Sequence, residues 1–347
     1  MSILIGPASG KIWSMVTVVI ATPVEDELVQ RLRAVDDRLD VRFERELLPP
    51  PRYPSDHVGD PSFTRSPEQE AQFNALTAAA EILFGFPRED PAQLALAVRR
   101  APNLRFVQAT YAGAGQQLAA AGLTRAELDR VAFASSSGVH ATPLAEWALF
   151  GILAFTKGLP RLLADKHARR WDHYPVDELP GATLLVVGQG AIGAEVTRLG
   201  KAFGMRVTGV TRSQGDLDAL LPQADAIVVS LPLTDETRGL LGRDRFARMR
   251  DGAIFVNVGR GGVVDEAALV DALRSGKLRG AALDVFTEEP LPPESPLWEL
   301  DNVILSPHTA ALSVNENARV VELFAENLRR YLAGDELVSR IKPDAFY

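Results

Sequence analysis

The chain has 347 residues, enough for about two domains, and its 46% hydrophobic and 24% charged residues are ordinary for a folded protein with sizeable cores. A formal net charge of −8 without a long basic run argues against nucleic acid and anionic membranes as partners. The chain has no cysteine, which excludes disulfides and thiol catalysis, and no run of 18 apolar residues that would predict a transmembrane helix. We therefore expect a cytoplasmic protein.

From about residue 16 to 140, strand-like and helix-like segments alternate. Lys11 and the apolar run after it would allow a signal peptide. The β-branched composition of Val16–Ile20 and the acidic helix start at Glu25 favour a buried first strand instead. A proline-rich segment, residues 47–66, predicts an ordered loop rather than a helix or a central strand. Further strand-like segments lie at 82–84, 104–107 and 131–133.

A long apolar helix is predicted over residues 143–157. Thr142 is its expected N-cap and Pro143 its first helical residue. Because the segment is apolar on nearly all sides, we expect it to be buried or to lie at a subunit contact, which motivates a homodimer as a hypothesis.

From residue 182 onward, short apolar runs alternate with turns or helical stretches. The six runs are 183–187, 206–210, 226–231, 253–258, 280–285 and 302–306. This rhythm predicts a parallel, doubly wound sheet. The final stretch, residues 313–332, has the pattern of one amphipathic helix that could return to the first domain.

A glycine-rich motif follows the first of these six strands and opens a helix, which is the context that a dinucleotide-binding loop requires. Its first glycine permits a tight turn, its second lets a pyrophosphate approach the backbone, and its third lets helix and strand pack closely. We therefore expect a dinucleotide to bind at Gly188, Gln189, Gly190, Ala191, Ile192 and Gly193.

The second strand of this sheet ends without the carboxylate that NAD-selective sites place there to bind the ribose 2′-hydroxyl. It ends instead in Thr211, Arg212 and Ser213, which offer hydrogen-bond donors and a cation suited to a 2′-phosphate. These residues favour NADP(H), with NAD(H) as the alternative if Arg212 is only a solvated surface residue.

Arg260, Glu289 and His308 follow the fourth, fifth and sixth strands, so all three are expected at the carboxyl edge of the sheet, where open α/β sheets bind ligands. Reduction of a keto acid needs a cation for its carboxylate, a proton donor, and a group that keeps the donor protonated. Arginine, histidine and a carboxylate supply these functions. Each residue taken singly is ordinary; their joint placement favours a catalytic trio.

The series of motifs from residue 179 to 310 resembles the D-isomer-specific 2-hydroxyacid dehydrogenases, and the resemblance extends over about residues 75–335. It rests on Leu179–Gly181 leading into the glycine loop, Ser230–Thr234, Asn257–Asp265, Leu283–Val285 with Glu289–Pro292, and Pro296–Trp298 through Ser306–His308. The resemblance implies that Arg260 binds substrate, that His308 is the acid/base, and that Glu289 pairs with it. It also implies cofactor contacts at Leu231, Pro232, Thr237, Val258, Gly259 and Asp284.

The same resemblance implies a substrate loop at residues 108–113, whose backbone amides bind the carboxylate, with a second loop at residues 83–86. The substrate-binding residues are then Phe86, Tyr111, Ala112 and Gly113, together with Arg260. The chain departs from the family in lacking an acid in Ala112–Gly115, where the family often continues as Ala-Gly-Val-Asp, and in its long segment 47–66, which could cover a cleft. No metal site is predicted. The other histidines are expected in structural, surface or loop positions: His57, His140, His167 and His173.

These observations predict an α/β protein of two Rossmann-like, doubly wound parallel-sheet domains. A discontinuous substrate-binding domain would comprise residues 16–140 and 309–347, and a dinucleotide-binding domain residues 141–308. The expected activity is hydride transfer between NAD(P)H and C2 of a small 2-keto or 2-hydroxy acid, whose identity stays open. Formate dehydrogenase is disfavoured, because its family pattern has Gln at the position of Glu289, whereas a dinucleotide-sensing corepressor of the same fold remains an alternative.

Overall fold

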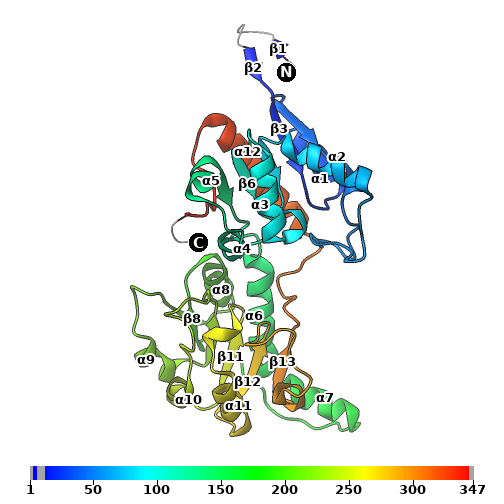
Figure 1. The fold of residues 1–347 in the computed structure, drawn as a ribbon. Coiled ribbons are helices and arrows are strands. Elements are labelled where there is room, and N and C mark those ends of the chain that lie inside the picture. The colour runs from blue at the N-terminus through cyan, green and yellow to red at the C-terminus, as the bar shows by residue number, and fades with distance from the viewer. Residues whose placement is uncertain (1–2, 6–11, 344–347) are drawn as a thin grey trace. The chain divides into compact units, whose positions relative to one another are not determined.

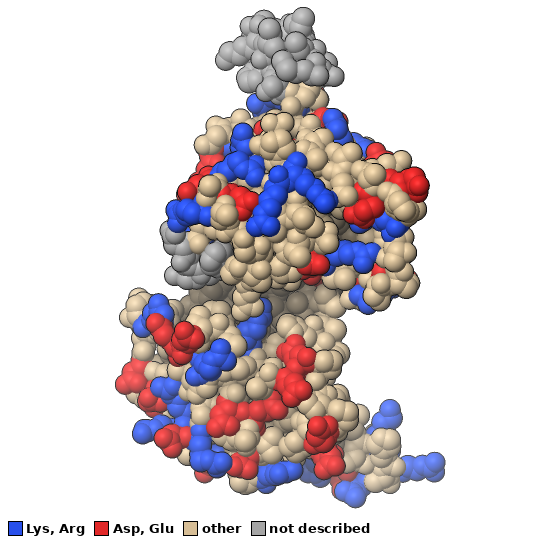
Figure 2. All heavy atoms as spheres, viewed as in Figure 1, with Lys and Arg blue, Asp and Glu red and all other residues tan. Residues whose placement is uncertain are grey.

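The computed structural model describes residues 3–5 and 12–343 (Figure 1). The chain forms two compact units: unit 1 contains residues up to 139 and from 313 onward, and unit 2 contains residues 140–312. A short antiparallel pair, β1 (Ile3–Ile5) and β2 (Ile12–Ser14), precedes the first sheet. Basic and acidic side chains are interspersed on the visible face of both units (Figure 2).

Unit 1 is built on a five-stranded parallel sheet in the order β4-β3-β5-β6-β7. Its strands are β3 (Val16–Ile20), β4 (Leu39–Arg42), β5 (Ile82–Phe84), β6 (Phe106–Gln108) and β7 (Ala132–Ala134). Four of these strands, β3, β5, β6 and β7, were predicted within two residues at each end. β4 was missed, because its two charged residues interrupt the apolar pattern, and it lies at an edge of the sheet, where one side needs no partner strand.

Helices cover both faces of the unit 1 sheet. One face packs on α1 (Asp26–Arg33) and on the C-terminal α12 (Glu316–Ala333), where Phe324 stacks on Phe84 with ring centroids 4.4 Å apart. The other face packs on α2 (Pro67–Ala78), α3 (Pro91–Arg100) and α4 (Ala114–Ala120). A short α5 (Arg125–Arg130) precedes β7. The C-terminal helix thus returns to the first unit, as its sequence suggested, although it begins three residues later than predicted.

The proline-rich segment 47–66 is an ordered loop that follows a 3-10 turn, η1 (Arg45–Leu47). The buried Asp56 organises it by accepting hydrogen bonds from the Arg52 guanidinium at 2.6 and 3.0 Å and from the Gly59 N–H at 3.0 Å. His57, expected at the surface or in a loop, is a buried loop residue whose Nδ1 lies 3.3 Å from Thr22 Oγ1, just after β3.

Unit 2 contains a six-stranded parallel sheet in the order β13-β12-β11-β10-β8-β9. Its strands are β8 (Thr183–Val187), β9 (Arg206–Val210), β10 (Ala226–Val229), β11 (Ala253–Asn257), β12 (Leu278–Leu283) and β13 (Val303–Leu305). Together with the sheet of unit 1, this arrangement confirms two doubly wound parallel-sheet domains. The chain reverses direction across the sheet at β8, which pairs with β9 on one side and β10 on the other. Such a switch point is where doubly wound sheets bind ligands.

The predicted apolar helix is α6 (Ala141–Thr156), which packs with α8 (Ala191–Ala202) on one face of the unit 2 sheet. Gly151 permits this packing, because a Cβ there would lie 2.5 Å from Cβ of Ala282. The helix begins two residues earlier than predicted, with His140 as N-cap and no side-chain cap, so the assignment of Thr142 as N-cap was wrong. The opposite face packs on α10 (Arg243–Arg248) and α11 (Glu266–Arg274).

After α6 the chain turns into α7 (Leu159–His167). No single helix in the described part of the chain is long and apolar enough to cross a membrane; only α6 and α7 together meet that test, as a pair bent by 60°.

Candidate active-site residues

The glycine loop lies between the end of β8 and the start of α8. Gly188 has φ of 103°, a conformation that favours glycine, and Gly190 is the N-cap of α8 with no side chain capping the helix. A Cβ at Gly193 would lie 1.9 Å from the carbonyl oxygen of Gly188, so this position requires glycine. A Cβ at Gly190, in contrast, would meet no described atom within 4 Å. Gly190 therefore borders open space at a helix N-terminus, which suits an anion.

Gln189 lies against the next strand. A Cβ at Gly209 of β9 would be 2.3 Å from its side-chain nitrogen, so Gln189 packs over the β9 backbone. Ala191 and Ile192 form the first turn of α8, and Ile192 packs partly on the core shared with α6.

The turn after β9 is closed by its own hydrogen bonds. The Thr211 N–H donates to the carbonyl oxygen of Gln214 at 2.9 Å, and the Gln214 N–H donates to Oγ1 of Thr211 at 3.1 Å. Arg212 and Ser213 are exposed. The guanidinium of Arg212 donates to the carboxylate of Glu236, which sequence analysis did not single out.

The segment after β10 runs beside the glycine loop. A Cβ at Gly188 would lie 3.1 Å from the side chains of both Ser230 and Leu231. Pro232 begins a turn that is closed when Thr237 Oγ1 donates to the Pro232 carbonyl at 2.7 Å. Leu231, Pro232 and Thr237 thus belong to one short segment next to the glycine loop.

Asn257, at the end of β11, positions Arg260. Its buried side chain accepts the Gly259 N–H at 3.0 Å and donates to the carbonyl oxygen of Arg260 at 3.2 Å. Val258 faces the core, so only its backbone is available to a ligand. Arg260 is half-buried; its Nη1 donates to the Gly259 carbonyl at 2.7 Å, and it makes no ion pair with a residue that the structure describes.

Asp284 joins the ends of β12 and β13. This buried carboxylate accepts from Ser306 Oγ at 2.7 Å and from the Ala310 N–H at 2.9 Å. It therefore holds the segment that contains His308 against β12.

The carboxylate of Glu289 bridges the loops after β12 and β13. Its Oε2 lies 2.7 Å from Nδ1 of His308, and its Oε1 accepts the Phe286 N–H at 2.9 Å. A carboxylate can only accept, so we assign the proton of this contact to Nδ1. His308 has φ of 55°, and its own N–H donates to the Ser306 carbonyl at 2.9 Å. The imidazole is thereby held from one side, and Nε2 remains for another partner.

In unit 1, the predicted substrate residues follow β5 and β6. Phe86 is buried, and its ring meets the Tyr111 ring edge-on at 5.9 Å. The Tyr111 hydroxyl is buried and makes no hydrogen bond with the described residues. Burial and the nearby Glu89 carboxylate raise the pKa of Tyr111. Ala112 is exposed, and Gly113 is the N-cap of α4.

Two neighbours of this edge were not predicted. Arg88 and Glu89 both have positive φ, 54° and 52°, a backbone conformation that costs energy in residues with a Cβ. Thr110 Oγ1 donates to Glu89 at 3.3 Å, and Arg88 donates to the carbonyl oxygen of Phe63, which ties the segment 47–66 to the loop after β5. No local sequence signal marks either residue.

The structure thus brings Arg260, Glu289 and His308 to the carboxyl ends of three adjacent strands of one sheet, β11, β12 and β13. The predicted cofactor residues lie along the same edge of unit 2, whereas Phe86, Tyr111, Ala112 and Gly113 lie at the carboxyl edge of the unit 1 sheet. In the described part of the chain, no cluster of three or more His, Asp or Glu side chains is arranged to hold a metal ion.

Comparison with known proteins identifies the family. A family model described as "D-isomer specific 2-hydroxyacid dehydrogenase, NAD binding domain" matches residues 149–310. Glyoxylate reductase from Aeropyrum pernix is 44% identical over 169 residues, which cover 45% of this chain and 50% of that protein. The chain spans between 39% and 56% of the length of the first curated relatives that it matches.

Solved structures match over nearly the whole chain. A D-isomer specific 2-hydroxyacid dehydrogenase family protein from Aeromonas salmonicida has a TM-score of 0.74 at 30% identity, over 95% of this chain and 99% of that chain. The D-isomer specific 2-hydroxyacid dehydrogenase from Xanthobacter autotrophicus, in complex with NADPH and MES, has a TM-score of 0.73 at 29% identity, over 95% and 100%. Strand order, motif order and these matches agree, and the chain belongs to the family of D-isomer specific 2-hydroxyacid dehydrogenases.

Proposed function

We propose that the protein is an NAD(P)-dependent oxidoreductase that transfers a hydride to or from C2 of a small 2-keto or 2-hydroxy acid. The observation that carries this proposal is the 2.7 Å contact between Glu289 and His308. Arg260 follows β11, the strand beside the one that Glu289 follows. The glyoxylate reductase named above, to which this chain is similar, supports a small 2-keto acid as substrate.

The proposed dinucleotide site is the glycine loop with the segments beside it. Gly190 leaves the backbone accessible at the N-terminus of α8, while Gly188 makes the turn and Gly193 the close packing, an arrangement that fits a pyrophosphate. Gln189, Ala191 and Ile192 complete the loop. The remaining proposed contacts lie along the same edge of the sheet, at Leu231, Pro232, Thr237, Val258, Gly259 and Asp284. When bound, a nicotinamide dinucleotide supplies or accepts the hydride.

We infer a preference for NADP(H) from the turn after β9. Thr211, Arg212 and Ser213 place two hydroxyls and a guanidinium where an NAD-selective site has a carboxylate. The related enzyme from Xanthobacter autotrophicus was solved with NADPH, which supports this preference.

His308 is the proposed acid/base. With Nδ1 directed at Glu289, Nε2 is the ring nitrogen that can donate a proton to the carbonyl oxygen of a keto acid, or accept one from a hydroxy acid. Glu289 holds the ring in one orientation and stabilises its charged form. The residues follow β12 and β13, whose ends Asp284 ties together through its hydrogen bonds with Ser306 and Ala310.

Arg260 is the proposed ligand of the substrate carboxylate. One guanidinium nitrogen is engaged by the Gly259 carbonyl, and the others have no ion-pair partner among the described residues. A guanidinium matches a carboxylate in geometry and charge, and it also stabilises negative charge that develops on the reacting oxygen. In unit 1 we propose substrate contacts at Phe86, Tyr111, Ala112 and Gly113; the last three lie in the loop after β6, whose backbone amides suit a carboxylate.

Initial rates with glyoxylate, hydroxypyruvate and a panel of larger 2-keto acids, each with NADPH and with NADH, test this function. We expect steady turnover of at least one small 2-keto acid, faster with NADPH. Tight NADPH binding without turnover of any acid would instead favour a dinucleotide-sensing binding protein, the alternative that shares this fold.

We also propose a homodimer. Several large apolar side chains are exposed on α6, on α7 and just after it, including Phe150, Leu162, Leu163 and Trp171, of which Trp171 is 90% exposed. Such side chains commonly mark subunit contacts. Light scattering at micromolar concentration should give twice the mass of the chain, and a monomeric mass would contradict the proposal.

The cytoplasm remains the proposed compartment, because the chain has no cysteine.

A further inference from the structure

The ion pair between Arg212 and Glu236 joins two turns on opposite sides of β8. Arg212 follows β9, and Glu236 follows β10, while β8 lies between these two strands in the sheet. Strands two positions apart are separated by about 10 Å. The two side chains therefore reach toward each other beyond the carboxyl end of β8, at the level of the glycine loop.

Both turns are closed by their own hydrogen bonds, which hold the backbone that carries each of the two side chains. The turn with Arg212 is closed by the mutual hydrogen bonds of Thr211 and Gln214. In the turn with Glu236, the Thr234 N–H donates to Oγ1 of Thr237 at 2.8 Å, and the Arg238 N–H donates to the Thr234 carbonyl at 2.9 Å.

We propose that Glu236 sets cofactor selectivity by competing with the 2′-phosphate of NADPH for the guanidinium of Arg212. This inference rests on the proposed dinucleotide site. The Arg212 side chain is 76% exposed and that of Glu236 63% exposed, and ion pairs between exposed groups are weak. The 2′-phosphate carries more charge than the Glu236 carboxylate and can displace it from Arg212. Glu236 then loses its ion pair and stays near the negatively charged phosphate, which weakens the binding of NADPH. NADH has no 2′-phosphate, so it leaves the pair intact.

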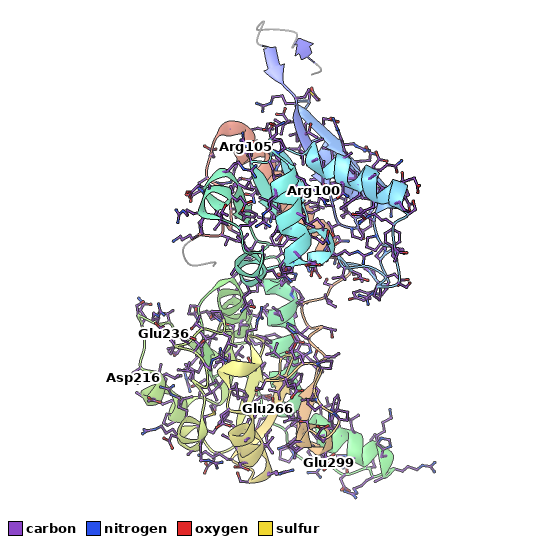
Figure 3. The ribbon with its side chains drawn as sticks, viewed as in Figure 1. Arg100, Arg105, Asp216, Glu236, Glu266 and Glu299 are labelled. Carbon is purple, nitrogen blue, oxygen red and sulfur yellow. The ribbon has the colours of Figure 1, made fainter. Side chains whose placement is uncertain are left out.

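The surrounding acidic residues differ from Glu236 in their contacts. Figure 3 labels Glu236 and Asp216 along the same side of unit 2. Asp216 is occupied as the N-cap of α9 (Leu217–Leu220), where it accepts the N–H groups of Asp218 and Ala219. Asp235 precedes Glu236, is exposed, and has no ion pair or hydrogen bond with its side chain among the residues described. Asp235 therefore offers a control of equal charge in the same turn.

The test measures the Kd of NADPH and of NADH by fluorescence titration, without substrate, for the wild type, Glu236→Gln, Asp235→Asn, Arg212→Ala and the double variant Arg212→Ala/Glu236→Gln. We expect Glu236→Gln to lower the Kd of NADPH about two- to fivefold, the range of an exposed ion pair, and to change the Kd of NADH much less. Asp235→Asn should give clearly less than half of that gain. In the Arg212→Ala background, Glu236→Gln should give a clearly smaller gain, because the contested cation is gone and only the repulsion between Glu236 and the phosphate is relieved.

Three results would overturn the proposal: an unchanged Kd of NADPH in Glu236→Gln, an equal gain in Asp235→Asn, or the same gain from Glu236→Gln with and without Arg212. In each case wild-type binding of NADPH leaves the proposed function standing. A wild-type protein that binds neither dinucleotide would overturn both proposals together.

Discussion

The carboxylate of Glu289 contacts the imidazole of His308 with one oxygen and a backbone N–H with the other. The first contact, to Nδ1, is 2.7 Å long, and the second, from Phe286, is 2.9 Å. The backbone contact fixes the carboxylate on the β12 loop, and the carboxylate in turn fixes the ring that follows β13. The orientation of His308 therefore depends on β12 and β13 being neighbours in the sheet.

His308→Ala removes the proposed proton donor without touching the glycine loop. We expect the maximal rate of 2-keto acid reduction to fall about 10²- to 10⁴-fold, the usual contribution of a general acid, while the Kd of NADPH changes little. His173→Ala, at an exposed position, serves as the control and should retain the wild-type rate. Full activity in His308→Ala would contradict the assignment.

Glu289→Gln keeps the shape of the side chain but removes its charge. A hydrogen bond to a charged partner is worth about 1.5–3 kcal/mol, so we expect the maximal rate to fall by about tenfold or more. The neighbouring Glu288→Gln removes the same charge from an exposed side chain and should leave the rate nearly unchanged. Equal effects of the two substitutions would show that the contact with His308 is not what matters.

Gly190→Ala separates dinucleotide binding from folding. The added methyl group meets no described atom within 4 Å, and the φ of −73° suits alanine, so the unfolding midpoint in urea should stay close to that of the wild type. The methyl group would, however, occupy the space proposed for the pyrophosphate. We expect the Kd of NADPH to rise by about tenfold or more, a loss of ~1.4 kcal/mol. Unchanged NADPH affinity would place the pyrophosphate elsewhere.

Arg212→Ala tests the 2′-phosphate contact. Loss of a charge-assisted hydrogen bond should weaken NADPH by about 1–3 kcal/mol and NADH far less. Thr211→Asp should shift the preference toward NADH, because a carboxylate repels phosphate and accepts from ribose hydroxyls. Equal losses for both cofactors, measured as Kd values, would remove Arg212 from the site.

Asp56 makes the stability of unit 1 depend on pH. Burial alone would raise the pKa of Asp56, but hydrogen bonds from the Arg52 side chain and from the N–H groups of Arg52 and Gly59 outweigh it and lower the pKa to about 2. The ionised carboxylate therefore stabilises the fold above the ordinary aspartate pKa of about 4, and this contribution is lost as the pH falls toward 2.

Asp56→Asn should accordingly lower the free energy of unfolding by roughly 1–3 kcal/mol at pH 6 and by less at pH 3, measured by urea denaturation. Asp60→Asn is the control, since Asp60 lies in the same loop and its carboxylate bonds only to the exposed Ser62. A difference between wild type and Asp56→Asn that does not shrink at pH 3 would contradict the assigned role.

Strand positions in unit 2 followed from the sequence because buried parallel strands are apolar on both faces and appear as uninterrupted runs. β8 and β9 match their predicted ranges, and the other four agree within two residues at each end. The strand β4 and the start of α6 escaped prediction. Charges interrupt the apolar pattern of β4, and α6 begins without the side-chain cap that local sequence signals rely on.

The sequence by itself determined which residues stand at the carboxyl ends of strands, since that depends only on the order of elements along the chain. It therefore placed Arg260, Glu289 and His308 on one edge. Only the tertiary structure decided which groups are in contact. Glu236 pairs with Arg212, the Asn257 side chain donates to the Arg260 carbonyl, and the buried Asp56 accepts from Arg52 within the segment 47–66. These contacts depend on the order of strands across the sheet and on loop conformation, whereas the period of apolar residues reports only which face of each element is buried.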